Sequence, residues 1–123
     1  MPTPESRRED WKIEKIENMA IGELPKLDRP PGMFVRDIIL PEYGMNVSKL
    51  ARHLDLNRAH LSNVFNGKSD MTRELAYRLA AAFRDELADF LIAYQTAWEV
   101  QRDGNLRKKI ASEVKRLEPV EAE

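Results

Sequence analysis

The side chains best suited to recognise a ligand gather in one segment, NRAHLSNVFNGKSD, which runs from residue 57 to 70. Helical spacing places Leu61, Val64 and Phe65 on one side of it, so the opposite side is polar or small. A helix face that only meets solvent would more often carry Lys and Glu. Arginine can bond guanine bidentately, asparagine can bond adenine in the same way, and alanine can contact a thymine methyl. We therefore predict that this side reads base edges, and we name it the reading face. The reading face consists of Arg58, Ala59, Ser62 and Asn63.

A second set of residues is suited to hold phosphates around the reading face. Asn46 and Val47 begin the preceding helix, whose first N–H groups and positive dipole end attract anions. Such contacts position a protein on a duplex but do not read its sequence. The predicted phosphate contacts are Asn46, Val47, Lys49, His60, Asn66 and Lys68, with Arg52 and Arg73 as further candidates.

Charge supports this prediction only through its distribution. The 123-residue chain has a net charge of −1, which by itself does not favour a nucleic-acid partner. Between residues 46 and 73, however, there are five Lys and Arg residues and only two Asp, whereas the stretch from 85 to 103 is acidic. Such a basic patch fits a phosphate footprint, and ordinary surface scatter explains it equally well.

Composition excludes several other classes of protein. The chain has about the length of one domain, and it contains no cysteine, which excludes disulfides and cysteine-based sites. No apolar run approaches the length of a membrane span, and the N-terminus lacks the apolar core of a signal peptide, so a cytoplasmic protein is expected. There is no glycine-rich phosphate loop, and His53 and His60 fall on different expected helices. We therefore expect neither an enzyme nor a cofactor or metal site.

Hydrophobic spacing predicts an all-α fold without a convincing strand. Residues 1–10 have the composition of a disordered tail, 11–24 are weakly helical, and 24–32 form a proline-rich linker. The expected helices are one from about 33 that Pro41 stops, then 47–54, 58–66 ended by Gly67, one from 73 to about 83, 87–102, and 105–118 ended by Pro119. Asn46, Asn57 and Thr72 are the expected N-caps of the second, third and fourth of these helices. The short helices 47–54 and 58–66 flank a three-residue turn, which is the spacing of a helix-turn-helix unit.

The run from Val47 to Phe83 resembles the XRE (lambda-repressor-like, Cro/C1-type) helix-turn-helix family. The shared motifs are LA at 50–51, the Asn57 cap, NGK at 66–68 and RLA at 78–80. Within that family the chain resembles the HigA-type antitoxins through PGM at 31–33, YGMN at 43–46 and YQTAWEV at 94–100. It departs from the pattern at Asp55, where the family commonly has a turn glycine, and at 84–85, where a glycine usually separates two helices. The resemblance implies a five-helix DNA-binding and dimerisation domain over 30–103, with an N-terminal extension over 1–29 and an additional C-terminal helix and tail over 104–123.

The resemblance also implies partners. HigA-type proteins bind palindromic operators as homodimers, repress their own operon, and neutralise a RelE/HigB-like toxin that cleaves messenger RNA. The natural dimer candidates here are Phe90, Leu91, Tyr94 and Trp98, and equally these side chains could complete the core of the monomer. The extension over 1–29 could wrap a partner or fold back on its own domain. The alternatives are a stand-alone repressor of the same fold without a toxin, and an interaction adaptor that no longer binds DNA.

Overall fold

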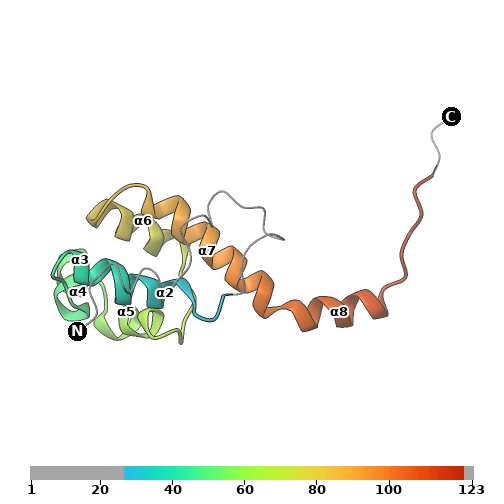
Figure 1. Cartoon of the computed structure of the whole chain (residues 1–123), viewed down its shortest axis with the longest axis horizontal. Helices are drawn as coiled ribbons and strands as arrows, with labels where there is room; N and C mark the ends of the chain where they lie inside the picture. Colours follow the sequence, from blue (N-terminus) through green and yellow to red (C-terminus); the bar gives the residue numbers. More distant parts are fainter. Residues whose placement is uncertain (1–26, 121–123) are drawn as a thin grey trace.

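The computed structural model describes residues 27–120, and every regular element in that range is a helix. This part of the chain is therefore all-α, as the hydrophobic spacing predicts (Figure 1). The predicted tail over 1–10 and the weak helix over 11–24 lie outside the described residues. In chain order the elements are α2 (Pro31–Phe34), η3 (Val35–Ile39), α3 (Leu40–Glu42), α4 (Val47–Leu54), α5 (Arg58–Phe65), α6 (Arg73–Ala82), α7 (Leu87–Arg102) and α8 (Gly104–Glu113).

Local capping signals set where three of these helices begin. Asn46, Asn57 and Thr72 each accept a hydrogen bond from the backbone N–H three residues later, at Lys49, His60 and Leu75. Each cap supplies an acceptor to an N–H that has no partner inside its own helix. The three predicted caps are confirmed, and α6 and α7 remain separate helices although no glycine lies between them.

The first helix contradicts its predicted end. The prediction that Pro41 stops it was wrong, because α2, η3 and α3 follow one another without a gap from Pro31 to Glu42. Segment η3 is a π-helix in which Leu40 donates its N–H to the carbonyl of Val35, five residues back. This shifted register accommodates a proline, which has no N–H to donate and whose ring would clash in an unbroken α-helix. The helix ends instead at Glu42, and Gly44 follows with a φ of 61°, which allows the Met45 N–H to bond the Leu40 carbonyl at 3.0 Å.

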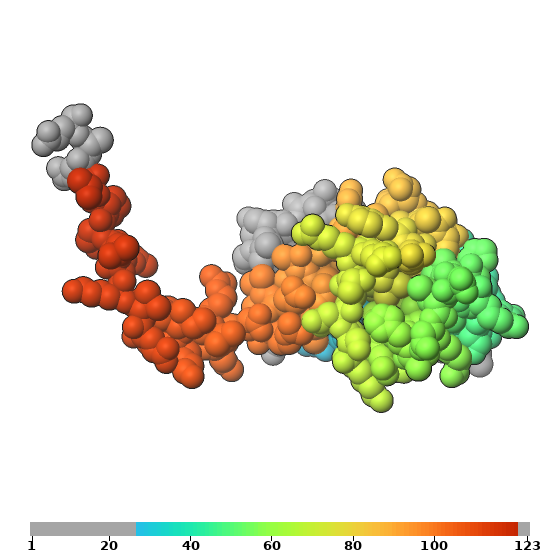
Figure 2. All heavy atoms as spheres, turned by 180° about the vertical axis from the view of Figure 1, so that it is seen from behind, coloured from blue at the N-terminus to red at the C-terminus, as the bar shows by residue number. Residues whose placement is uncertain are grey.

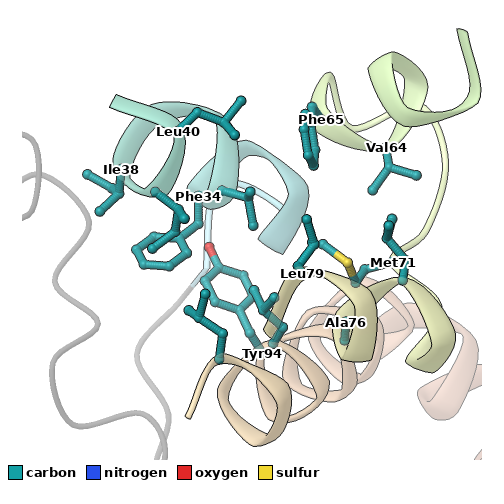
Figure 3. Packing of buried hydrophobic residues seen from close by; sticks show 14 of the residues in the cluster. Phe34, Ile38, Leu40, Val64, Phe65, Met71, Ala76, Leu79 and Tyr94 are labelled. Carbon is teal, nitrogen blue, oxygen red and sulfur yellow. The ribbon is translucent and has the colours of Figure 1, made fainter. Parts of the chain in front are cut away.

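The core lies where α2 packs between α5 and α7. Phe34 of α2 contacts the rings of Phe90 and Tyr94 on α7, with centroids 5.1 and 6.4 Å apart. Figure 3 shows Val64 and Phe65 of α5 facing the same interior as Phe34 of α2 and Tyr94 of α7. Helix α5, which carries the reading face, is therefore held in place by the apolar side chains packed against its buried side.

Helix α2 lies close to the backbone of α5 at Gly32, which is buried. A Cβ atom built at this position would lie 2.0 Å from the carbonyl oxygen of Val64 and 2.7 Å from its carbonyl carbon. Both atoms belong to the backbone of α5, so they cannot move without moving that helix. Gly32 therefore sets the distance between α2 and the helix that carries the reading face.

The last helix also differs from its prediction. Helix α8 ends at Glu113, and Val114 is already extended, so the chain leaves the helix before Pro119. None of its residues is buried, and Leu106 and Ile110 are 53% and 48% exposed. Figure 2 shows α8 and the segment after it extending away from the other helices. With no partner within the described residues, the C-terminal part of the predicted helix lacks the packing that stabilises short helices.

Replacing Asp55 by glycine is expected to raise the free energy of unfolding by roughly 0.5–1 kcal/mol. Asp55 ends α4 with a φ of 54° and a ψ of 48°, a left-handed conformation that an L side chain adopts at a cost. Part of the gain is offset because glycine also has more freedom in the unfolded chain. Urea denaturation would measure the change. Asp55→Ala keeps the Cβ atom and should give no gain, and equal stability of both variants would show that Asp55 is not strained.

Candidate nucleic-acid interface

The reading face lies on the outer side of α5. Arg58, Ala59 and Asn63 are exposed, and Ser62 is half-buried. Behind them Leu61, Val64 and Phe65 are buried in the core. The split between the two sides follows from the spacing of apolar residues and from the packing of α2 against this helix. The structure therefore presents all four side chains of the reading face on one helix whose back is fixed.

The turn between α4 and α5 spans residues 55–57, as the helix-turn-helix spacing predicts. The Leu56 N–H donates to the Ala51 carbonyl at 2.9 Å, which closes the end of α4 before Asn57 caps α5. Because the turn is this short, the two helices pack directly on one another. This is the local arrangement in which a second helix can enter a DNA major groove.

The predicted phosphate contacts surround this helix. Val47 is half-buried at the first position of α4, and the remaining five predicted phosphate contacts are exposed. These five are Asn46, Lys49, His60, Asn66 and Lys68. Gly67, with a φ of 77°, turns the chain after α5, and the backbone N–H of Lys68 donates to the Asn63 carbonyl at 2.8 Å, so Lys68 lies beside the end of the reading face. Their contact with phosphates stays a prediction.

A hydrogen bond between α4 and α5 fixes the first residue of the reading face. The Nε atom of Arg58 donates to the hydroxyl oxygen of Ser48 at 2.7 Å. This leaves the Nη1 and Nη2 ends of the guanidinium to face a base or a phosphate. Sequence reasoning did not single out Ser48, because nothing in its spacing shows that it lies beside a residue ten positions later.

The other end of the reading face carries a second group of contacts. Asn66 donates from Nδ2 to the Ser62 hydroxyl at 3.2 Å, and its Oδ1 accepts from Nη1 of Arg36 at 3.2 Å. Arg36 also donates to both carboxylate oxygens of Asp37, at 2.8 and 3.2 Å. The hydrogen bond to Asp37 is the main reason that the pKa of Arg36 is raised. Sequence reasoning also missed Arg36, which lies in η3, outside the helix-turn-helix unit.

The predicted dimer residues lie mostly within the monomer. Leu91 and Tyr94 are buried, and the Tyr94 hydroxyl donates to the Arg29 carbonyl at 2.6 Å. Burial also raises the pKa of the Tyr94 phenol. Phe90 and Trp98 are half-buried and pack against the same core. For Leu91 and Tyr94 the structure fits the alternative that the sequence left open, in which they complete the core.

Within residues 27–120, no group of three or more His, Asp or Glu side chains could hold a metal ion. No described helix is both long enough and apolar enough to cross a membrane.

Several proteins of known sequence resemble this chain. It is 35% identical to the HTH-type transcriptional regulator YbaQ of Escherichia coli over 91 residues, which cover 68% of this chain and 76% of YbaQ. It is 30% identical to virulence-associated protein A of Dichelobacter nodosus over 81 residues, or 64% of this chain and 79% of that protein. With virulence-associated protein A' of the same bacterium it shares 31% identity over 74 residues, covering 60% of this chain and 64% of that relative. No family model matches the chain, and no solved structure matches it.

Proposed function

Because the chain belongs to the family of helix-turn-helix transcriptional regulators, we propose that it binds a specific DNA operator and represses transcription from it. The observation that carries this proposal is the reading face: an arginine, an asparagine, a serine and an alanine on the outer side of a helix whose back is buried. Those groups match the donors, acceptors and methyls of the major groove. The protein acts in this proposal as a binding protein and not as an enzyme.

The finer proposal is that the protein is a HigA-type antitoxin. It would adopt the five-helix lambda-repressor-like arrangement, bind a palindromic operator as a homodimer, repress its own operon, and neutralise a RelE/HigB-like toxin. Support comes from the motifs that resemble HigA-type proteins and from the short turn between α4 and α5. A two-fold dimer would place its half-sites about 10 bp apart. Of the proposed dimer residues, Phe90 and Trp98 retain exposed surface for a second copy.

A stand-alone repressor without a toxin is the second candidate. The similarity to YbaQ, whose name describes an HTH-type transcriptional regulator, supports this candidate. Co-expression with the neighbouring gene separates the two candidates. An antitoxin should co-purify with that gene product and restore the growth that the product inhibits. A protein that binds an operator but neither co-purifies nor restores growth is the stand-alone repressor.

DNA binding itself is tested by selecting duplexes from a random library with the 123-residue chain. We expect one enriched sequence with two-fold symmetry and an affinity that falls steeply with salt. A library that shows no enrichment would contradict the proposal.

Lys68→Ala should weaken binding to the selected duplex and to a scrambled duplex by the same factor. The reason is that Lys68 lies past the reading face and carries a charge that suits a phosphate but not one particular base. The slope of log affinity against log salt should fall in magnitude by about 1. Lys115→Ala, on the exposed segment beyond α8, is the matched control and should leave both quantities unchanged. A loss confined to the selected duplex would show instead that Lys68 reads a base.

A further inference from the structure

We propose that Arg36 is a positioning residue of the DNA interface, which orients the Ser62 hydroxyl through the side chain of Asn66. The inference rests on the proposed function and adds a residue that lies outside the helix-turn-helix unit. Arg36 belongs to the π-helical segment η3, 26 residues before Ser62 (62 − 36). The hydrogen bonds Arg36–Asn66 and Asn66–Ser62, each 3.2 Å long, join the two in sequence.

The direction of these hydrogen bonds follows from the chemistry of the groups. A guanidinium can only donate, so the side chain of Asn66 must turn its Oδ1 towards Arg36. The Nδ2 group of Asn66 then points the other way and donates to Ser62. A hydroxyl that already accepts a hydrogen bond on one side directs its own proton elsewhere. Ser62 is therefore set to donate outward, and its ligand should be an acceptor atom of a base, such as N7 or O6 of guanine.

The charge on Arg36 favours this role over direct contact with a phosphate. Asp37 holds the guanidinium through two hydrogen bonds, a fork-to-fork pairing that fixes its orientation and neutralises it locally. Only 38% of the Arg36 side chain is exposed. A neutralised, half-buried arginine gains little from a phosphate, but one of its three remaining N–H donors holds the Asn66 amide in one of its two orientations.

The backbone explains why this arginine reaches α5. Asp37 and Arg36 lie in the π-helical turns that precede Pro41, where the register of backbone hydrogen bonds shifts by one residue. Such a shift changes the direction in which the side chains of a helix point. Because α2 is locked against α5 at Gly32, η3 is held at a fixed place beside the end of the reading face.

The base pair that Ser62 contacts is first identified as the one at which Ser62→Ala loses discrimination. The test then measures discrimination at that base pair, which is the ratio of the affinity for the selected duplex to the affinity for duplexes substituted there. We expect Arg36→Ala to lower this ratio about three- to tenfold, with an unchanged salt slope. In a protein that already carries Ser62→Ala, Arg36→Ala should not change the ratio further, because the hydroxyl that Arg36 orients is absent. Arg36→Lys keeps one donor for Asn66 and should restore part of the discrimination.

Asn66→Asp tests the same inference with Arg36 in place. A carboxylate would still accept from Arg36 but would also draw the Ser62 proton inward, so discrimination should fall at the Ser62 base pair. The ratio is unaffected by any uniform loss that the new negative charge causes. If Arg36→Ala is too unstable to study, which thermal unfolding would show, this variant decides the question: unchanged discrimination overturns the inference.

Arg78→Ala is the matched control, because Arg78 also pairs with a carboxylate, Glu74, at 2.9 Å, but lies on α6. It should leave discrimination and salt slope unchanged. A uniform loss with a salt slope reduced by about 1 in Arg36→Ala would show a direct phosphate contact and overturn the inference, while the proposed function stands. Absence of specific binding by the unaltered protein would overturn both.

Discussion

Gly32→Ala is expected to lower the free energy of unfolding by about 2–3 kcal/mol, near the upper end for an overpacked site. The added Cβ atom would lie 2.0 Å from the Val64 carbonyl oxygen, a separation that no pair of non-bonded atoms tolerates. Relief requires α2 and α5 to move apart, because the obstructing atoms are backbone and not the end of a flexible side chain. The movement would also loosen the packing of Phe34 and Phe65, which are buried on these two helices. Urea denaturation followed by circular dichroism would measure the loss.

Gly104→Ala is the matched control for this prediction. Gly104 is also a helical residue, because it is the first residue of α8. A Cβ atom built there meets no other atom within 4 Å. Alanine favours a helix over glycine, so this variant should be as stable as the unaltered protein or slightly more so. A Gly32→Ala protein that matches Gly104→Ala in stability would mean that α2 and α5 do not approach as described. A folded Gly32→Ala protein should also bind the operator less selectively, since its reading face would be displaced.

The elements that sequence could predict are those with local causes. Asn46, Asn57 and Thr72 each act on an N–H only three residues away, so residue type and position were enough to place the starts of α4, α5 and α6. The left-handed turn at Gly67 was predictable for the same reason. The exposed side of α5 followed from the spacing of its three buried residues. The placement of the reading face thus depends on signals within a window of about ten residues.

The features that sequence missed have causes far along the chain or in the backbone. Pro41 is a helix breaker by local rules, and only the π-helical register of η3 shows how the helix continues through it. Tyr94 is an aromatic residue on a helix rich in apolar groups, which fits a dimer surface as well as a core. Its burial depends on Phe34 and on the Arg29 carbonyl, both about 60 residues earlier, which spacing cannot reveal.

The contacts that hold the reading face were also missed, because they join residues that are distant in the chain or lie on different helices. Arg36 and Asn66 are 30 residues apart, and Ser48 and Arg58 are 10 apart on different helices. Polar residues on helices are usually solvated, so their types alone give no sign that they position other side chains. Sequence therefore indicated which residues lie on the outer side of α5, and the structure adds which residues contact them from other helices.

Arg58→Ala and Asn63→Ala are each expected to cost about 1–3 kcal/mol of operator binding and to relax discrimination at one base pair. Both side chains are exposed on α5, and the Nη1 and Nη2 ends of Arg58 lie beyond its bond to Ser48. Their planar groups suit bidentate bonds, Arg58 to a guanine and Asn63 to an adenine. Affinities for the selected duplex and for its single-base-pair variants would be measured at one salt concentration. Binding to a scrambled duplex should change little for Asn63→Ala, because the lost side chain carries no charge.

Arg58→Lys separates base reading from phosphate binding at this position. Lysine keeps the positive charge but lacks the fork that bonds two acceptors of one guanine, and it cannot pair with Ser48 through an Nε–H as arginine does. If Arg58 reads a base, Arg58→Lys should lose most of the discrimination that Arg58→Ala loses while retaining the salt slope of the unaltered protein. If Arg58 only holds a phosphate, the lysine variant should bind every duplex nearly as well as the unaltered protein. Unchanged operator affinity in both Arg58→Ala and Asn63→Ala would mean that the outer side of α5 does not face the bases, and the recognition surface would have to be sought on another helix.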